Sequence, residues 1–241
     1  RIEQIKHYTK IIESVKNYNM SRETMEYDVV IVGGGPSGLA AAIKLKQLDS
    51  NINVCLLEKA SEIGAHILSG NVFETRALNE LIPNWKDLNS PIKTKVTKEK
   101  FLFLGKNKSL SWPTWLLPSV QQNHNNYIIS LANLCRWLAE QAETLGVEIF
   151  PGFPASEILY NDDGSVKGVA TQDMGIDKEG NKKDGYEPGI NLIGKVTVFA
   201  EGCRGHLGKQ LIKKFELNKG KDPQQYGIGF KEIWEVDEKK H

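Results

Sequence analysis

Residues 27–48, YDVVIVGGGPSGLAAAIKLKQL, decide the fold of this chain. The apolar, β-branched run before the glycines predicts a strand that is buried on both faces. The Ala- and Leu-rich run after the glycines predicts a helix with small residues for close packing. Residues 51–59, NINVCLLEK, then predict a second strand. Strand, glycine turn, helix and strand in this order form a βαβ unit, which implies a parallel sheet with a right-handed crossover.

The glycine turn carries the GxGxxG spacing of dinucleotide-binding folds. Gly33 allows the tight turn, Gly35 lets the backbone approach a pyrophosphate, and Gly38 lets the helix pack on the strand. The positive end of the helix that begins near Pro36 stabilises the phosphate charge. Glu58, at the end of the second strand, is placed to bind ribose hydroxyls and argues against NADP. The turn alone leaves NAD, FAD and a purely structural strand-to-helix turn open.

A second glycine-ended strand favours FAD. Residues 196–205, VTVFAEGCRG, contain a strand that ends in Ala200, Glu201 and Gly202. The small residues at this end allow a long ligand to approach closely. In the glutathione-reductase-like class of flavoproteins such a segment follows a β-hairpin, as it does here. An ordinary buried strand with a glycine-ended turn is the alternative.

The rest of the chain continues the alternation of helices and strands. The patterns predict helices at 74–82, 130–145 and 206–215, a parallel strand at 147–150, a β-hairpin across 155–173, a surface loop at 174–190 and a strand at 226–236. We therefore predict an α/β protein with a glutathione-reductase-like, FAD-binding Rossmann-type fold, inserted β-hairpins and an incomplete C-terminal end. Residues 1–26 are interpreted as a polar tail or partial transit segment, and residues 27–241 as a partial FAD-binding domain.

Composition excludes several function classes. The chain has 241 residues with 31 Lys and Arg against 30 Asp and Glu, and a net charge of +1 is no footprint for nucleic acid. Cys55, Cys135 and Cys203 are isolated, so they predict neither a disulfide framework nor a metal site in this chain. No apolar run has the roughly 18 residues that a membrane span requires, so any membrane contact is made from one side.

The segment 101–118, FLFLGKNKSLSWPTWLLP, is apolar but interrupted by glycine and proline. An apolar hairpin with tryptophans and nearby lysines is typical of proteins that lie in the headgroup region of one leaflet. The alternative is that this hairpin belongs to the core of a second domain.

These motifs together resemble the electron-transfer-flavoprotein:ubiquinone oxidoreductase family. The resemblance begins near Tyr27 and is carried by DVVIVGGGPSGLAAAIKLKQL, CLLEKASEIGAHILSG, LAEQAETLGVEIFPGFPASEIL, KVTVFAEGCRGHLGKQL and YGIGFKEIW. It implies an enzyme on the matrix side of the mitochondrial inner membrane. The resemblance further implies that electrons pass from reduced electron-transfer flavoprotein to ubiquinone through FAD and a 4Fe-4S cluster.

The resemblance also implies roles for particular residues. The FAD site would consist of Gly33, Gly35, Pro36, Ser37, Gly38, Glu58, Lys59, Gly64, Ala65, His66, Leu68, Ser69, Gly70, Ala155, Ala200, Glu201 and Gly202. The membrane and quinone surface would consist of Phe101, Phe103, Trp112, Trp115, Leu116 and Leu117. His66 is equally a candidate for a structural histidine, and no catalytic residue or metal ligand is predicted.

Two departures from the family pattern accompany the resemblance. Ser130 stands where many flavoproteins of this class carry an arginine that reaches the FAD phosphates, and Arg136 is not an obvious substitute. The cluster cysteines and the acidic segment that binds the ribityl chain are expected in a C-terminal domain, so the sequence resembles the front of a longer protein. We expect the isolated fragment to be inactive.

Two other functions are compatible with the residues. One is an NAD(P)H-dependent flavin monooxygenase or a geranylgeranyl-reductase-like enzyme on the same fold. The other is a flavin-free binding protein, because prenyl-protein escort proteins share this fold. Reduction of the flavin by a nicotinamide favours the first, and a colourless preparation favours the second.

Overall fold

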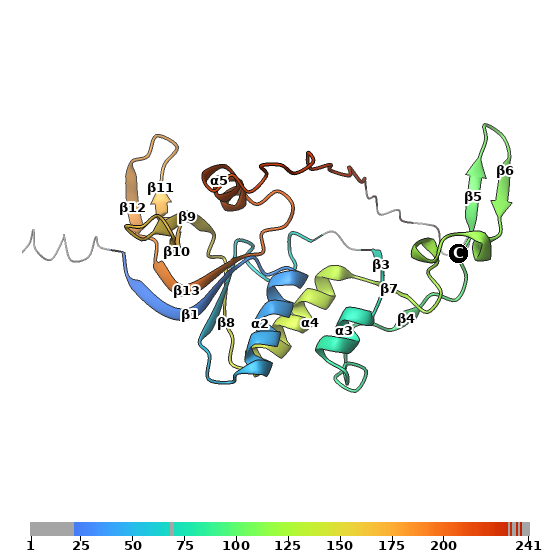
Figure 1. The fold of residues 1–241 in the computed structure, drawn as a ribbon, viewed down its shortest axis with the longest axis horizontal. Coiled ribbons are helices and arrows are strands. Elements are labelled where there is room, and N and C mark those ends of the chain that lie inside the picture. Colours follow the sequence, from blue (N-terminus) through green and yellow to red (C-terminus); the bar gives the residue numbers. More distant parts are fainter. Residues whose placement is uncertain (1–21, 68–69, 231, 233–234, 236, 238–241) are drawn as a thin grey trace, which may run out of the picture.

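The fold is built on one mixed six-stranded sheet. The computed structural model describes residues 22–67, 70–230, 232, 235 and 237. The strand order is β8-β2-β1-β13-β10-β9, in which the first four strands are parallel and β10 pairs antiparallel with both β13 and β9 (Figure 1). The bounds are β1 Thr24–Val32, β2 Val54–Glu58, β8 Glu148–Pro151, β9 Ala155–Tyr160, β10 Val166–Thr171 and β13 Asn191–Phe199. The central pair β1 and β13 thus joins segments from opposite ends of the sequence.

Helices cover the two faces of this sheet unequally. The alternation of β1 sends Val29 and Ile31 to one face and Val30 and Val32 to the other. The first face packs against α2 (Pro36–Leu48), α3 (Arg76–Leu81) and α4 (Leu131–Thr144). The second face packs against α5 (His206–Lys214), which buries Leu207 completely. The two layers hold the carboxyl ends of the parallel strands in fixed positions beside the start of α2.

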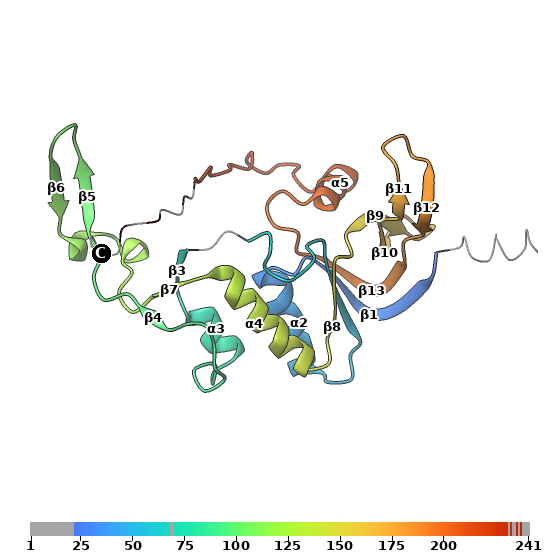
Figure 2. The ribbon, with the colours of Figure 1, turned by 180° about the vertical axis from the view of Figure 1, so that it is seen from behind.

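Three smaller sheets extend from this core. β3 (Asn71–Phe73), β7 (Tyr127–Ile129) and β4 (Thr94–Lys95) form one sheet, β5 (Phe101–Leu104) and β6 (Ser109–Trp112) a hairpin, and β11 (Met174–Ile176) and β12 (Lys182–Glu187) another hairpin. Two 3-10 helices, η1 (Thr114–Leu116) and η2 (Ser119–Gln121), follow β6. The two hairpins lie at opposite ends of the molecule, as both ribbon views show (Figures 1 and 2).

Most of the predicted elements are confirmed. The βαβ unit, the helices at α3, α4 and α5, the parallel strand β8 and the hairpin β9–β10 lie within a few residues of their expected positions. Three expectations are wrong. Residues 174–190 contain the hairpin β11–β12 instead of a loop, because Asp177 accepts backbone hydrogen bonds from Glu179 and Asn181 and closes a tight turn.

The other two corrections concern the ends of the chain. The expected polar tail ends earlier than Glu26, because Thr24–Glu26 pair with Asn191–Ile193 and extend β1. Residues 226–230 of the expected last strand are irregular and exposed, since no neighbouring strand pairs with them in the described part of the chain. Residues 1–21, 231, 233–234, 236 and 238–241 lie outside the described residues.

Because two thiols are buried, we expect the stability of the protein to fall at alkaline pH. Burial raises the pKa of Cys55 from 9.0 to about 12 and that of Cys135 to about 11. Because the unfolded thiols ionise first, their contribution is complete below pH 9 and is lost as pH rises from there toward the folded pKa values. We expect the free energy of unfolding to fall by about 1.4 kcal/mol per pH unit and per cysteine. Urea unfolding at a series of pH values from about 8 to about 11 measures this decline, and a Cys55→Ala variant should show a shallower one.

Candidate functional site

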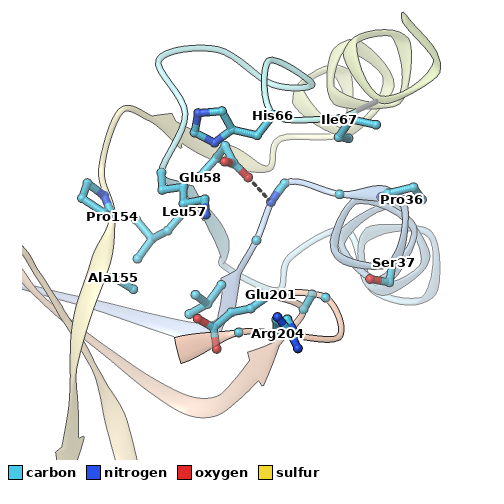
Figure 3. A pocket seen from close by; sticks show the side chains of 18 of the residues that line it. Pro36, Ser37, Leu57, Glu58, His66, Ile67, Pro154, Ala155, Glu201 and Arg204 are labelled. Carbon is cyan, nitrogen blue, oxygen red and sulfur yellow. Dashed lines mark hydrogen bonds between the residues drawn. The ribbon is translucent and has the colours of Figure 1, made fainter. Parts of the chain in front are cut away.

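A cavity of about 430 Å³ lies at the carboxyl ends of the parallel strands β1, β2 and β13. Its volume is in the range of ligand pockets, and its position is where open α/β sheets bind ligands. The lining residues are Val32, Gly33, Gly34, Gly35, Pro36, Ser37, Leu57, Glu58, Lys59, Gly64, His66, Ile67, Leu131, Pro154, Ala155, Ala200, Glu201, Gly202, Arg204, Gly205 and His206. Figure 3 shows His66 and Ile67 on one side of it and Glu201 and Arg204 on the opposite side.

Two of the three motif glycines are required by the protein itself. Gly33 has a φ of +114°, and a Cβ there would lie 2.5 Å from the carbonyl oxygen of Ala200. A Cβ on Gly38 would overlap the carbonyl oxygen of Gly33. These contacts explain how β1, β13 and α2 approach one another so closely at the edge of the cavity.

Gly35 is different, because nothing in the protein requires its small size. Its φ of −83° suits any residue, and no protein atom lies within 4 Å of the position that a Cβ would take. Gly35 lines the cavity, so its missing side chain leaves room for a bound molecule instead of a protein neighbour. This is the room that a pyrophosphate needs in order to reach the backbone.

The N-terminus of α2 opens into the same cavity. No side chain caps this end, Pro36 occupies the first turn, and the first turn contains no acidic residue. Backbone N–H groups and the positive end of the helix dipole therefore favour an anion here. The structure places Ser37 beside this helix end as well (Figure 3).

Glu58 lies beside the glycine turn with its carboxylate in a fixed orientation. Its Oε2 accepts a hydrogen bond from the backbone N–H of Gly34 at 2.8 Å, and its Oε1 accepts one from Ala60 at 2.9 Å. Each carboxylate oxygen can accept more than one hydrogen bond, so capacity for ribose hydroxyls remains. The oriented acid, the open position at Gly35 and the uncapped helix fit the adenosine and pyrophosphate parts of FAD.

Glu201 has a structural task that the sequence did not reveal. Its Oε2 accepts a hydrogen bond from the N–H of Gly208 at 2.7 Å, and its Oε1 accepts one from Leu207 at 3.3 Å. The side chain is 12% exposed and lies 3.5 Å from Nδ1 of His206. Glu201 therefore caps α5, whose own N-cap residue is Gly205, and fixes that helix against the cavity.

The structure brings most of the predicted FAD residues together. Those that line the cavity are Gly33, Gly35, Pro36, Ser37, Glu58, Lys59, Gly64, His66, Ala155, Ala200, Glu201 and Gly202. Gly38, Ala65 and Gly70 do not line it, and Gly38 instead forms the helix-to-strand contact. Leu68 and Ser69 lie outside the described residues.

Sequence reasoning missed two basic residues at the cavity, Arg204 and His206. Both follow β13 directly, and the guanidinium of Arg204 lies 4.7 Å from the ring centroid of Tyr226. The signal was available, because loops after neighbouring parallel strands meet at one edge of the sheet. Pro154, immediately before Ala155, was missed in the same way.

The missing arginine at Ser130 has a local explanation. The hydroxyl of Ser130 accepts a hydrogen bond from the N–H of Asn133 at 3.3 Å and caps α4. Arg136 binds Glu62 at 2.9 Å and the side chain of Asn133, so it is engaged away from the cavity lining. Arg204 is thus the arginine that the fold places at the site.

The hairpin at 101–118 is present, and its apolar side chains are exposed. Trp115 is 75% exposed and Phe103 is 54% exposed, while Leu117 is half-buried. Within the described residues these side chains are therefore not part of a core, and the alternative of a core element of a second domain stays untested. The ribbon views place this hairpin far from β1, β13 and the start of α2, whose residues line the cavity (Figures 1 and 2).

The cysteines form no cluster. Cys55 and Cys135 are buried, Cys203 is exposed, and all three are free thiols. Within the described ranges no three His, Cys, Asp or Glu side chains are grouped to hold a metal ion. Over the same ranges no helix has the length and apolar character needed to cross a bilayer.

Comparisons with known proteins agree with this geometry. A family model described as an NAD(P)-binding Rossmann-like domain matches residues 31–85. Among solved structures, a geranylgeranyl bacteriochlorophyll reductase-like protein from Thermoplasma acidophilum aligns with a TM-score of 0.53 at 20% identity, over 73% of this chain and 39% of that one. A probable FAD-dependent monooxygenase from Pseudomonas aeruginosa aligns with a TM-score of 0.52 at 13% identity, over 78% and 46%. These likenesses establish the fold.

Curated sequences are much closer. The electron transfer flavoprotein-ubiquinone oxidoreductase of Pseudomonas aeruginosa is 57% identical over 92% of this chain and 41% of its own length. The proteins with this name from rice and cattle, both termed mitochondrial, are 53% and 52% identical over 91% and 92% of this chain. The chain spans about two-fifths of the length of these relatives, covering 38% of the rice protein and 36% of the bovine one.

Proposed function

This chain is homologous to the N-terminal part of the electron transfer flavoprotein-ubiquinone oxidoreductase family, and from that premise we propose that its protein is an FAD-dependent oxidoreductase. The proposed electron donor is reduced electron-transfer flavoprotein and the proposed acceptor is ubiquinone. The observation that carries the proposal is the open space at Gly35, which lies in the cavity at the uncapped start of α2. The chain that contains it is 57% identical to a relative with this name.

The residues of the cavity have separate tasks in this proposal. The N-terminus of α2 and the backbone at Gly35 bind the pyrophosphate, and Glu58 accepts the ribose hydroxyls. The turn at Ala200–Gly202 closes the site, with Glu201 fixing α5 beside it. FAD, when bound, supplies the redox chemistry, and the chain positions it and limits the access of water.

The proposal includes a 4Fe-4S cluster bound elsewhere in the full-length protein. The three cysteines of this chain are dispersed, and two of them are buried in separate clusters of the core. The curated relatives have about three-fifths of their length beyond the matched part. Iron analysis of the protein before and after Cys55, Cys135 and Cys203 are each replaced by Ala should show no loss of iron.

Reconstitution with FAD followed by electron transfer tests the function directly. Purified full-length protein should show flavin absorbance and should reduce a short-chain ubiquinone when reduced electron-transfer flavoprotein is added. Bleaching of the flavin by NADPH, with no response to reduced electron-transfer flavoprotein, would instead support the monooxygenase or geranylgeranyl-reductase-like function. A protein that remains colourless after incubation with FAD would support a binding protein.

The exposed hairpin is proposed to attach the protein to one leaflet of the mitochondrial inner membrane, on its matrix side. The names of the rice and bovine relatives support the mitochondrial assignment. The supporting feature of this chain is its exposed apolar hairpin, which is accompanied by two tryptophans, the residues that are enriched at bilayer interfaces. Resistance to high salt and release by detergent, after fractionation of mitochondria, test this location.

Replacing Trp112, Trp115, Leu116 and Leu117 together by Ser should weaken liposome binding while leaving the FAD content unchanged. Burial of apolar surface contributes about 25 cal/mol per Å², so these side chains together supply several kcal/mol. A loss of about 3 kcal/mol corresponds to a roughly 100-fold weaker affinity in a sedimentation assay. Met174→Ser/Ile176→Ser, an exposed pair on the other hairpin, is the control and should bind like the parent. Unchanged binding of the fourfold variant would refute the attachment.

A further inference from the structure

The hairpin β5–β6 has two chemically different faces. Directly opposed residues of antiparallel strands share a face, so Phe101 with Trp112 and Phe103 with Leu110 form one entirely apolar face. The ring of Phe103 contacts those of Phe101 and Trp112 edge to face, with centroids 5.3 Å and 6.1 Å apart. This aromatic face is therefore preorganised, although all four side chains are exposed.

The opposite face is only half apolar. Leu102 lies opposite Ser111, and Leu104 lies opposite Ser109. The two serine hydroxyls on this face have to keep hydrogen-bond partners, which water supplies and hydrocarbon does not. The aromatic face is thus suited to an apolar phase, and the face with the serines is suited to water or to lipid headgroups.

Positive charge is concentrated around the hairpin. Residues 93–112 contain six lysines and one acidic residue, so this segment carries +5 while the whole chain carries +1. The lysines are Lys93, Lys95, Lys98, Lys100, Lys106 and Lys108. All six are exposed, and the acidic residue, Glu99, accepts hydrogen bonds from the backbone and side-chain N–H groups of Asn123. The segment complements a surface of negative charge.

The position of the charges opposes an insertion that leads with the tip. Lys106 and Lys108 occupy the turn between the strands, where the N–H of Gly105 donates to the carbonyl oxygen of Lys108. A tip-first orientation would bury both ammonium groups in hydrocarbon. It would also place two unpaired strand edges there, because among the described residues β5 and β6 pair with each other alone.

We propose that the hairpin lies flat on an anionic bilayer, with the aromatic face toward the acyl chains and with Lys106 and Lys108 bound to lipid phosphates. This orientation keeps both strand edges and the serine face at headgroup level, where water satisfies them. It rests on the membrane attachment proposed above and adds a lipid class and an orientation to it. The attraction of each lysine to an anionic surface strengthens binding about fivefold, and salt screens it.

Vesicle binding tests the lipid class. The purified full-length protein should bind phosphatidylcholine vesicles more tightly when they include phosphatidylglycerol, and added salt should remove the difference. Lys106→Gln/Lys108→Gln should bind the anionic vesicles about 25-fold more weakly and the zwitterionic ones like the parent. The matched control is Lys178→Gln/Lys183→Gln, two exposed lysines of the β11–β12 hairpin at the other end of the molecule. Equal effects of the two charge changes, or no effect of the first, would overturn the proposal.

Quenching of tryptophan fluorescence by lipids brominated in the acyl chains tests the orientation. In a Trp115→Phe background, the quenching that is lost when Trp112→Phe is added reports on the aromatic face, because the other tryptophans of the chain contribute equally to both proteins. Adding Trp112→Phe with either Asn107→Trp or Leu102→Trp moves the reporter to the tip or to the opposite face. We expect the strongest quenching at position 112, and strongest quenching at position 107 would establish tip-first insertion and overturn the proposal.

The two sets of variants separate this inference from the proposed function. The lysine variants lie far from the cavity, so their flavin absorbance and quinone reduction in detergent should match the parent. If the serine variants of the hairpin lose binding but the lysine variants do not, membrane attachment stands and the anionic docking fails. If the parent binds no vesicle of either kind, both the attachment and the anionic docking fail, while the electron-transfer assay still decides the redox function.

Discussion

A Gly35→Val variant is expected to fold normally and to lose its flavin absorbance. The backbone at Gly35 is extended, with φ −83° and ψ −179°, and a Cβ there meets no protein atom within 4 Å. Valine is therefore compatible with the free protein, but its methyl groups occupy the space in which a pyrophosphate approaches the start of α2. Hydrogen bonds to charged groups contribute about 1.5 to 3 kcal/mol each, so loss of two weakens FAD binding at least about 100-fold.

Flavin absorbance after gel filtration measures the effect of Gly35→Val, and thermal unfolding followed by circular dichroism confirms the fold. Gly229→Val is a matched control, because that glycine also has open space around it and does not line the cavity. The control should retain FAD. A Gly35→Val protein that retains FAD as well would show that the pyrophosphate binds elsewhere.

A Gly38→Ala variant is expected to lose stability even without FAD. The new Cβ would overlap the carbonyl oxygen of Gly33, so α2 has to move away from β1. Overpacking of a close contact costs about 1 to 3 kcal/mol and occasionally more, and we expect the upper end because the obstructing atom is backbone. For a domain of this size a loss of about 3 kcal/mol lowers the melting temperature by about 6 to 12 °C.

The opposite sign is expected for Gly208→Ala, which serves as the control. A Cβ on Gly208 would lie at an ordinary contact distance of 3.5 Å from Oε2 of Glu201, and the residue lies inside α5. Alanine is favoured over glycine within a helix by about 0.5 to 1 kcal/mol. Equal melting temperatures for Gly38→Ala and the parent would show that α2 and β1 separate at little cost.

The elements with strong local signals were predictable. The βαβ unit, α4 and the hairpin β9–β10 follow from periodicity and turn residues that need no knowledge of distant contacts. Most of the cavity lining was predictable for the same reason, because the glycine turn, Glu58 and the turn after β13 each end a buried strand. Their meeting at one cavity follows from the parallel order of the strands.

The features that the sequence did not reveal depend on contacts between distant or polar residues. The β11–β12 hairpin is rich in Gly, Lys and Asp, and its turn depends on the carboxylate of Asp177, so hydrophobic alternation gave no sign of it. The capping of α5 by Glu201 joins residues on both sides of a glycine loop. The 101–118 segment is exposed because no other described segment packs against its apolar side chains, and a local sequence pattern does not contain this information.

The pairing of β1 with β13 has a consequence for folding during synthesis on the ribosome. Thr24 pairs with Asn191, so the strand that precedes the glycine turn has no partner on that edge until most of this chain has left the ribosome. At about 5 to 20 residues per second this delay is roughly 10 to 30 s. During that interval the β-branched edge of β1 is open to pairing with other chains, and the cavity that would bind a cofactor is not yet formed. Mutations that slow synthesis between β2 and β13 are therefore a route to aggregation that leaves the finished fold unchanged.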